Sequence, residues 1–253
     1  MSEPVLVTRE GPILTVTLNR PERRNPLSLE TIAALYDALT GSDATVIVLA
    51  ATGPAFSAGH DLREMTDRAP EFYDDLFRAC GELMLAIHDL PQPVIASVQG
   101  IATAAGCQLV AACDLAVAAT SARFATPGVR VGLFCTTPMV EVARAVGRRR
   151  AMQMLLTGDL IDAPTAAEWG LVNEVVPDDH LAARAMELAA QIATASPLVL
   201  ATGKRAFYAN LEPGLPGAYD HAGPIMAASA GTDDAQEGFA AFLEKRAPTW
   251  TGT

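Results

Sequence analysis

Two stretches of the chain, VLAATGPAFSAGHDL at residues 48–62 and VIASVQGIATAAGCQL at residues 94–109, follow the same plan. Each begins with an apolar run that predicts a buried strand. Each then passes through small residues, which let a ligand approach the backbone closely, and leads toward a helix. The N–H groups at a helix N-terminus are unpaired and lie at the positive end of the helix dipole. Two such groups aimed at one point would form an oxyanion hole, which polarises a carbonyl group.

Strand and helix patterns alternate around these two stretches. Apolar or alternating runs predict strands at residues 5–8, 13–19, 45–51, 93–98, 115–119 and 171–176. Helical spacing, with Ser28 as an N-cap for the first helix, predicts helices after residue 28 and at residues 72–90, 104–112, 138–146, 151–157, 163–169, 179–194 and 234–246. Strands alternating with helices, followed by a mostly helical part from residue 137, indicate an α/β core with a helical appendage.

Composition limits the classes of partner. The chain has 253 residues, of which 50% are hydrophobic and 19% charged, and this is typical of a globular protein with a substantial core. Its formal net charge of -11 predicts repulsion from nucleic acid and from anionic membranes. A polyanionic ligand would therefore need a local basic patch, for which the candidates are Arg23–Arg24, Lys204–Arg205 and Lys245–Arg246.

The cysteines and the first four residues predict the cellular compartment of the protein. Cys80, Cys107, Cys113 and Cys135 form no C-x-x-C pair, and no histidines fall at ligand spacing, so we expect no metal site. The opening residues MSEP are neither basic nor apolar. We therefore expect no signal peptide, reduced thiols and a cytoplasmic protein.

The apolar segment at residues 94–119 is long enough to suggest a membrane span. Polar and small residues interrupt it, among them Gln99, Gln108 and Asp114. A strand, a buried helix and a second strand explain the pattern better than a membrane-spanning helix.

The two opening stretches also resemble a known family. FSAGHDL at residues 56–62 is similar to the F-S/A-A-G-A-D-I/L signature of the crotonase (enoyl-CoA hydratase/isomerase) superfamily. PVIASVQG at residues 93–100, AAGCQL at residues 104–109 and CDL at residues 113–115 are similar to its second signature, K/R-P-V-I-A-A-V-N-G…G-G-G-C-E-L…C-D.

Further matches to the family follow in the family's order along nearly the whole chain. They lie at residues 18–27, 156–172 and 237–246. FATPGVRVGLFCTTP at residues 124–138 resembles one subgroup, the enoyl-CoA-hydratase-domain-containing proteins, which lack the usual acids.

The resemblance implies an α/β fold of the ClpP/crotonase type, a spiral of ββα units with a C-terminal helical region that mediates trimers, often paired as hexamers. Residues 1–195 are expected to form the crotonase core with an acyl-CoA site. Residues 196–253 are expected to form the helical region that trimerises and covers the CoA site. The resemblance implies a CoA thioester as substrate or ligand and no separate cofactor.

The resemblance also implies which residues meet the thioester. The N–H groups of His60 and Ala105 would grip its carbonyl oxygen. Ala105 replaces a family glycine, and its methyl group is tolerable there if its φ is negative.

Other residues are implied to contact the CoA part of the ligand. The loop at residues 55–62 would lie against it through Ala55, Ser57, Ala58, His60, Asp61 and Leu62. Phe242 and Lys245 of a neighbouring subunit would approach the adenine and the phosphates. Arg23 and Arg24 are further candidates for phosphate contacts.

The family's acids are missing. Its two hydratase glutamates fall on Gln108 and Gly128, and a further acid position of some relatives falls on Thr136. None of the three can act as a base near neutrality, although Gln108 and Thr136 could hold a water molecule or a polar acyl group. Each lost general acid or base removes on the order of 10²–10⁴ in rate, so useful hydration is expected to be lost. A Gln108→Glu, Gly128→Glu double variant is expected to regain hydration if the scaffold is otherwise intact.

Substitutes for the missing acids are few. His60 is the only imidazole inside a signature and is a candidate base, although the family's side chain there usually points away from the ligand. Asp61 is expected to cap a short helix at residues 62–65. Cys135 is expected to be a packing residue, and Glu141 to lie on the surface or at a subunit interface.

Three functions follow. The first is an acyl-CoA-binding protein of fatty acid or lipid metabolism that has an oxyanion hole but lacks the hydratase acid/base pair. The second is an enoyl-CoA hydratase or isomerase, a lyase, that works through non-standard residues. The third is a non-catalytic oligomeric partner subunit. The acyl chain, the pathway and the choice between trimer and hexamer are left open.

Overall fold

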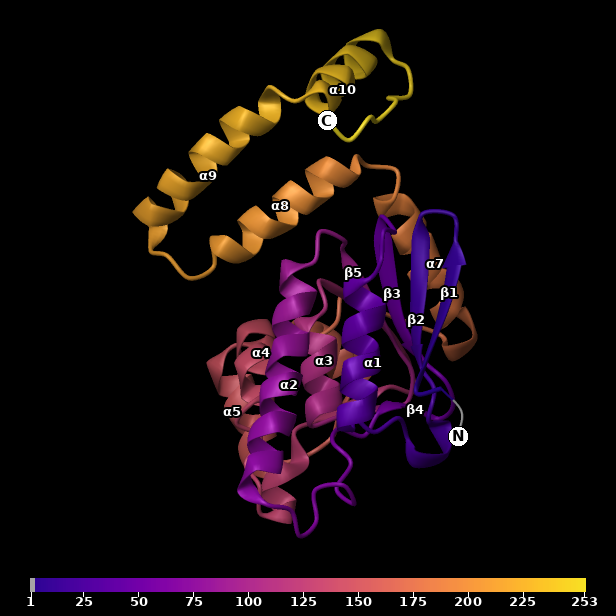
Figure 1. The fold of residues 1–253 in the computed structure, drawn as a ribbon, viewed down its shortest axis with the longest axis vertical. Helices are drawn as coiled ribbons and strands as arrows, with labels where there is room; N and C mark the ends of the chain where they lie inside the picture. Colours follow the sequence, from indigo (N-terminus) through magenta and orange to yellow (C-terminus); the bar gives the residue numbers. More distant parts are fainter. Residues whose placement is uncertain (1–2) are drawn as a thin grey trace.

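The computed structural model describes residues 3–253, and its core is built on a six-stranded sheet (Figure 1). β1 (Val5–Glu10) and β2 (Ile13–Leu18) form an antiparallel hairpin at one edge. The other strands run parallel to β2, in the spatial order β3 (Val46–Ala51), β5 (Val94–Val98), β7 (Leu115–Ala119) and β10 (Glu174–Val176). The strand predicted at residues 171–176 is therefore shorter than expected.

A second sheet of short strands lies beside the first. Its order is β4 (Ala55–Ser57), β6 (Ile101–Thr103), β8 (Arg123–Ala125) and β9 (Ile161–Asp162). β4 follows β3 along the chain, and α2 (Pro70–Asp89) comes next; β6 likewise follows β5 and precedes α3 (Ala105–Ala112). This repetition confirms the expected ββα units. The sequence did not predict these short strands, because two or three residues are too few to show an alternating pattern.

Helices cover both faces of the large sheet. α1 (Leu29–Thr40), α2 and α3 contribute to one hydrophobic core, and α7 (Leu181–Ile192) contributes to another on the opposite face. Ile47 and Leu49 of β3 belong to the first core, whereas Val46 and Val48 belong to the second. The strand is thus buried on both faces, as its unbroken apolar run predicts.

The remaining helices follow in chain order. They are η1 (Pro21–Arg23), η2 (Pro127–Val131), α4 (Pro138–Val146), α5 (Arg148–Thr157), α6 (Ala163–Trp169), η3 (Asp178–His180), α8 (Pro197–Ala209), α9 (Leu215–Ala230) and α10 (Asp233–Glu244). The helix predicted at residues 179–194 begins with the 3₁₀ turn η3 and continues as α7. α9 was not predicted, because Gly217, Gly223 and Pro224 inside it weaken the helical pattern.

α8, α9 and α10 form an arm that stands away from the core (Figure 1). The base of the arm is tied to the core by Lys204 of α8, whose ammonium lies 2.6 Å from a carboxylate oxygen of Asp114. The hydroxyl of Tyr208 donates to the same carboxylate at 2.8 Å. Only 6% of the Lys204 side chain is exposed, so this member of an expected basic patch is an internal anchor rather than a phosphate contact.

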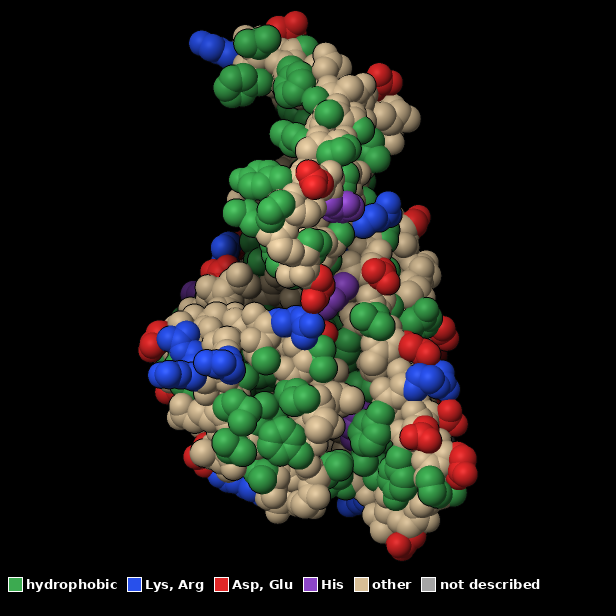
Figure 2. Space-filling view, turned by 90° about the vertical axis from the view of Figure 1, so that its left-hand side faces the viewer, with side chains coloured by type: hydrophobic (Ala, Val, Ile, Leu, Met, Phe, Trp, Pro, Cys, Tyr) green, Lys and Arg blue, Asp and Glu red, His purple; other side chains and the backbone are tan. Residues whose placement is uncertain are grey.

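The arm carries exposed apolar side chains, which Figure 2 shows beyond a narrow waist. Tyr219, Met226, Phe242 and Leu243 are each more than 70% exposed. Among residues 3–253, no single helix is long and apolar enough to cross a membrane. Only the two helical segments Asp178–Ile192 and Pro197–Ala209 taken together have the length and composition of a span, and they are bent by 101° relative to each other.

Candidate functional site

The loop at residues 58–60, just after β4, is held by the segment at residues 24–27. Hydrogen bonds join them from Ala58 N–H to the Arg24 carbonyl (2.9 Å), from Leu27 N–H to the Gly59 carbonyl (2.8 Å) and from Ser57 Oγ to the Asn25 carbonyl (2.8 Å). Because the N-terminal motif supplies these partners, it fixes the backbone of the first signature.

Asn25 is the centre of this support. It is 1% exposed and has a φ of 50°, a left-handed conformation that asparagine tolerates better than most residues. Its side-chain amide donates to the carbonyls of Thr52 (2.9 Å) and Ala55 (2.8 Å), and its side-chain oxygen accepts from the N–H of Arg20 (2.7 Å). Asn25 therefore joins η1 to both ends of the β3–β4 connection.

Gly59 brings the first signature against the second. Its φ is +86°, and a Cβ atom added to it would lie 2.9 Å from the Thr103 carbonyl oxygen and 3.2 Å from the backbone nitrogen of Ala105. The Thr103 hydroxyl also donates to the Ala58 carbonyl at 3.2 Å. The two loops thus touch, and any side chain at position 59 would separate them.

The backbone N–H groups of His60 and Ala105 lie on these touching loops. Neither N–H donates a hydrogen bond to any residue between 3 and 253. Ala105 is the first residue of α3 and has no positive φ, so its backbone conformation tolerates a methyl group where the family has glycine. The arrangement leaves two unpaired donors where the sequence predicts an oxyanion hole.

Ala104, immediately before α3, has a strained backbone. Its φ is 51° and its ψ is -120°, a combination that residues with a Cβ atom rarely adopt. Its N–H donates to the Ala125 carbonyl (2.9 Å), and its carbonyl accepts from the N–H of Gln108 (3.0 Å), so the surroundings hold it there. The positive φ thus falls on Ala104, one residue before Ala105, whose φ was the one in question in the sequence.

A cavity of about 170 Å³ opens beside the loops. It is lined by His60, Leu62, Met65, Phe77, Gly128, Val131, Leu133, Phe134, Cys135, Thr136, Thr137 and Pro138. Five positions named in the sequence analysis meet here: His60, Leu62, Gly128, Cys135 and Thr136. The lining is mostly apolar, so the cavity suits an acyl group. Met65 and Phe77 were not singled out in the sequence, because an apolar helix or turn residue looks the same whether it faces a core or a cavity.

The His60 ring lines this cavity, unlike the family's side chain, which usually points away. Its Nδ1 lies 2.9 Å from the Leu27 carbonyl oxygen, and its ring meets Phe77 edge to face at 5.5 Å between centroids. Burial lowers the pKa of His60 from its ordinary value, and the Leu27 bond only partly offsets this. The ring is therefore neutral at pH 7, and its Nε2 is buried with no hydrogen-bond partner among residues 3–253.

Gly128 has no room for a side chain. A Cβ atom there would lie 2.0 Å from the Leu133 carbonyl oxygen and 2.8 Å from Cys135 Sγ. The Leu133 N–H donates to the Gly128 carbonyl (3.0 Å), and the Gly128 N–H points to Cys135 Sγ (3.3 Å), so the loop is closed on itself. The expectation that Gly128→Glu could restore a carboxylate is therefore wrong, because backbone already fills that space. Burial raises the pKa of the Cys135 thiol, which accords with a packing role.

The other polar candidates lie away from the cavity. Gln108 is 3% exposed on α3, and its side-chain oxygen is 4.0 Å from Cys80 Sγ. Glu141 is 7% exposed and lies 3.5 Å from His88 of α2. The expected surface position is therefore wrong, the expected interface position stays a prediction, and Glu141 does not line the cavity. Burial raises the pKa of Glu141. No Asp or Glu is among the described residues that line the cavity, and no three His, Cys, Asp or Glu side chains within residues 3–253 could hold a metal ion.

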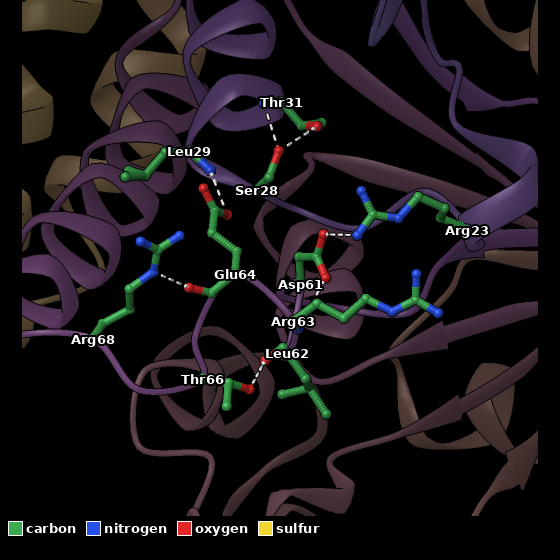
Figure 3. A network of polar contacts seen from close by, with 10 residues as sticks. All are labelled: Arg23, Ser28, Leu29, Thr31, Asp61, Leu62, Arg63, Glu64, Thr66 and Arg68. Carbon is green, nitrogen blue, oxygen red and sulfur yellow. Dashed lines mark hydrogen bonds and ion pairs between the residues drawn. The ribbon is translucent and has the colours of Figure 1, made fainter. Parts of the chain in front are cut away.

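Asp61 forms an ion pair with Arg23, as Figure 3 shows. Its other carboxylate oxygen accepts from the N–H of Arg63 at 3.1 Å. The expected cap is thus present, but residues 62–67 form turns and not the expected helix. Arg63, whose N–H donates to the same carboxylate that pairs with Arg23, is an exposed cation that was not singled out in the sequence; Figure 3 shows its side chain.

The expected CoA contacts are only partly accessible. Ala58 and Leu62 are exposed, as is Arg24, whereas the side chains of Ala55 and Ser57 are buried in β4. Phe242 and Lys245 lie at the far end of the arm from the β4 loops (Figure 1). Within one chain they do not join the site.

We predict that Ala104→Gly raises the free energy of unfolding by about 1 kcal/mol, because it relieves the positive φ at the start of α3. The neighbouring Ala105→Gly is the matched control and should lower it by about 1 kcal/mol, because this residue is helical. Urea unfolding of both variants at one protein concentration measures the two changes. A loss of stability in Ala104→Gly would contradict the strain assigned to this residue.

We also predict that Gly128→Ala lowers the free energy of unfolding by about 2–4 kcal/mol, since the Leu133 carbonyl must move. Gly81→Ala in α2 is the control, because nothing lies within 4 Å of a Cβ atom at Gly81. It should raise the free energy of unfolding by about 0.5–1 kcal/mol. Equal effects of the two substitutions would mean that the loop around Gly128 is not closed.

Comparison with known proteins identifies close relatives over the full length. The mouse protein named "Enoyl-CoA hydratase domain-containing protein 3, mitochondrial" is 44% identical over 257 residues, which cover 99% of this chain and 86% of the relative. A crystal structure of an enoyl-CoA hydratase from Mycobacterium smegmatis matches with a TM-score of 0.96 at 47% identity, covering 98% of this chain and 99% of that one. The crystal structure of the human enoyl-CoA hydratase domain-containing protein 3 matches with a TM-score of 0.95 at 44% identity, covering 98% and 100%.

These relatives correct the expected compartment. The mouse, rat and human proteins are all named mitochondrial, which contradicts the cytoplasmic location predicted from the sequence. That prediction depended partly on reduced thiols. The four cysteines are free and buried, and burial raises the pKa of Cys80 to about 12. Burial alone protects such thiols, so their state does not report a compartment.

A family model leads to the same family as the fold, the order of the motifs and these relatives. The family model described as enoyl-CoA hydratase/isomerase matches residues 8–253. The chain belongs to the enoyl-CoA hydratase/isomerase family, within the crotonase superfamily.

Proposed function

We propose that the chain binds acyl-CoA thioesters and polarises their carbonyl group, without hydrating enoyl groups at a useful rate. The observation that carries the proposal is the closed loop at Gly128, where the Leu133 carbonyl occupies the place of a side chain. A role in fatty acid or lipid metabolism is part of the proposal, because acyl-CoA is the ligand of this family.

The binding half of the proposal is supported by the unpaired N–H groups of His60 and Ala105. A thioester carbonyl oxygen between them would accept two hydrogen bonds from a fixed backbone. The exposed residues Ala58 and Leu62 would border the CoA chain, and Arg23, Arg24 and Arg63 would supply positive charge for its phosphates. These cations are local exceptions on a chain whose net charge is -11.

The second part of the proposal, that the chain does not hydrate enoyl groups at a useful rate, follows from the side chains that are missing. Hydration needs a base for the attacking water and an acid for the α-carbon, and each contributes on the order of 10²–10⁴ in rate. The amide of Gln108 cannot titrate, Gly128 has no side chain, and Thr136 offers only a hydroxyl. Polarisation of the carbonyl remains, and it supports binding and recognition without turnover.

The C-terminal part, residues 196–253, is proposed to mediate assembly into a trimer or a pair of trimers around the core of residues 1–195. The apolar side chains exposed on α9 and α10 support this, because monomeric proteins seldom leave such surface open to water. In an assembly, Phe242 and Lys245 at the end of the arm would approach the CoA site of a neighbouring subunit.

Calorimetric titration with butyryl-CoA should give a dissociation constant in the micromolar range. Hydration of crotonyl-CoA, followed by loss of the enoyl-thioester absorbance, should stay below about 1 s⁻¹. Gln108→Glu should leave that rate below about 1 s⁻¹ as well, because the Gln108 side chain does not line the cavity. A rise of about 10²-fold would instead show that a carboxylate at this position meets the acyl group. Gln92→Glu, which adds a carboxylate at another buried glutamine, is the matched control and should leave the rate unchanged.

The outcomes separate the competing functions. Wild-type turnover above about 1 s⁻¹ would favour a hydratase or isomerase that works through other residues. Failure of any acyl-CoA to bind would favour a non-catalytic partner subunit and would overturn the proposal.

A further inference from the structure

We propose that residues 247–253 form a strap that ties α10 to the elbow between α7 and α8, and that this strap fixes the position of α9 and α10. The elbow consists of residues 193–196, where the chain bends by 101° from α7 into α8. The inference goes beyond the proposed function, because it concerns the arm of a single subunit and does not depend on acyl-CoA.

Asp234, the second residue of α10, is the centre of the attachment. It is 1% exposed. Its carboxylate accepts from the N–H groups of Thr251 (2.6 Å) and Gly252 (3.1 Å) and from the hydroxyl of Ser196. Its own N–H donates to the Thr253 carbonyl at 3.0 Å. One buried carboxylate thus joins the strap, the start of α10 and the elbow.

The charge of Asp234 strengthens this attachment. Hydrogen bonds to the ionised form, that of the Ser196 hydroxyl above all, hold the pKa of Asp234 below its ordinary value. The carboxylate is therefore ionised at neutral pH, and hydrogen bonds to an ionised acceptor are stronger than those between neutral groups. A buried carboxylate without its donors would be costly, so its burial favours the closed strap.

Trp250 makes a second attachment to the elbow. Its indole N–H donates to the Thr194 carbonyl at 2.7 Å. The same ring lies against α10, because a Cβ atom added to Gly238 would be 3.4 Å from it. Where the chain leaves α10, Arg246 donates to both carboxylate oxygens of Glu237 (2.6 and 2.7 Å). Figure 1 shows the chain returning from the far end of α10 to its beginning.

Packing alone does not hold α9 in place. A cavity of about 840 Å³ separates it from α8, and its lining includes Leu198, Val199 and Ala206 of α8 and Tyr219 and Met226 of α9. The connection between the two helices is exposed at residues 211–214. α8 is anchored to the core through Lys204 and Tyr208, so the strap supplies the corresponding anchor for α10 and, through it, for α9.

The strap therefore decides where the apolar end of the arm stands. Phe242 and Leu243, which are 83% and 79% exposed, lie in the last turn of α10. With the strap closed, α10 is tied to the elbow at its start and to the returning chain at Glu237. With the strap released, α9 and α10 would swing on the connection at residues 210–214 while the core stays folded.

Electron–electron spin resonance distances on the full-length chain test the inference. Nitroxide labels are placed at Asp37→Cys in α1 and Asp220→Cys in α9, two exposed positions, whereas the four native cysteines are buried. Mixing with an excess of unlabelled chain restricts the signal to the distance within one subunit. We expect a single narrow distance distribution for this labelled chain.

Two substitutions release the strap by different means. Asp234→Ala removes the shared acceptor, and we expect loss of the narrow peak and a broad distribution. Trp250→Phe keeps an aromatic ring against α10 but removes the donor to Thr194, and it should broaden the distribution less. Asp233→Ala is the matched control, because it removes an exposed carboxylate from the same turn of α10 and should leave the peak narrow. Circular dichroism establishes that each variant is folded.

The outcomes are decisive in either direction. A peak that stays narrow and unshifted in both Asp234→Ala and Trp250→Phe would overturn the inference, as would a broad distribution in the chain without these substitutions. Equal broadening in Asp233→Ala would assign the effect to charge at the start of α10 and would also overturn it. If Asp234→Ala does not fold, Trp250→Phe decides. Failure of acyl-CoA to bind would overturn the proposed function and leave the strap standing.

Discussion

The contact between Gly59 and the turn at residues 103–105 is the constraint on which the site depends. It is possible only because position 59 has no side chain, and it brings two loops from different ββα units to within touching distance. The segment at residues 24–27 holds the first loop from behind, and the start of α3 fixes the second. This packing positions the N–H groups of His60 and Ala105, which have no partner among residues 3–253. The neighbouring backbone groups of Ala58 and Gly59 form hydrogen bonds to the segment at residues 24–27. The positive φ of Ala104 is the strain stored at this junction.

A second constraint acts at the loop around Gly128, which also lines the cavity. There the loop closes through the Leu133 carbonyl and Cys135 Sγ, and the space of a side chain at position 128 is filled by backbone. The acid that the family resemblance implies for position 128 could therefore not be restored by exchanging this one residue. His60 is among the residues that line the cavity; its Nδ1 lies against the Leu27 carbonyl, and its Nε2 is buried without a hydrogen-bond partner among residues 3–253. Under the proposed function, the two unpaired N–H groups polarise a carbonyl while no carboxylate of residues 3–253 lines the cavity.

The sequence predicted the α/β fold, and it singled out His60, Gly128 and Thr136, which the structure brings to one cavity. The unbroken apolar run of β3 predicted burial on both faces, and the small-residue stretches predicted where strands lead into helices at the site. The sequence did not predict the short strands β4, β6 and β8, because they are defined by their pairing with one another and not by a local pattern. The sequence also did not predict the direction of the His60 ring, the strain at Ala104 or the closed loop at Gly128. Each depends on contacts that form only in the folded chain. The compartment was predicted wrongly, because buried thiols are protected by packing in any compartment.

The central claim is that two backbone N–H groups polarise a thioester carbonyl, and infrared spectroscopy measures this directly. Isotope-edited difference spectra of butyryl-CoA carrying ¹³C at the thioester carbon would isolate the stretch of that carbonyl in the bound state. Two hydrogen bonds from His60 and Ala105 weaken the C=O bond, so the account predicts a shift of the stretch to lower wavenumber on binding. A bound carbonyl that absorbs at the same wavenumber as in a weakly hydrogen-bonding solvent would contradict it.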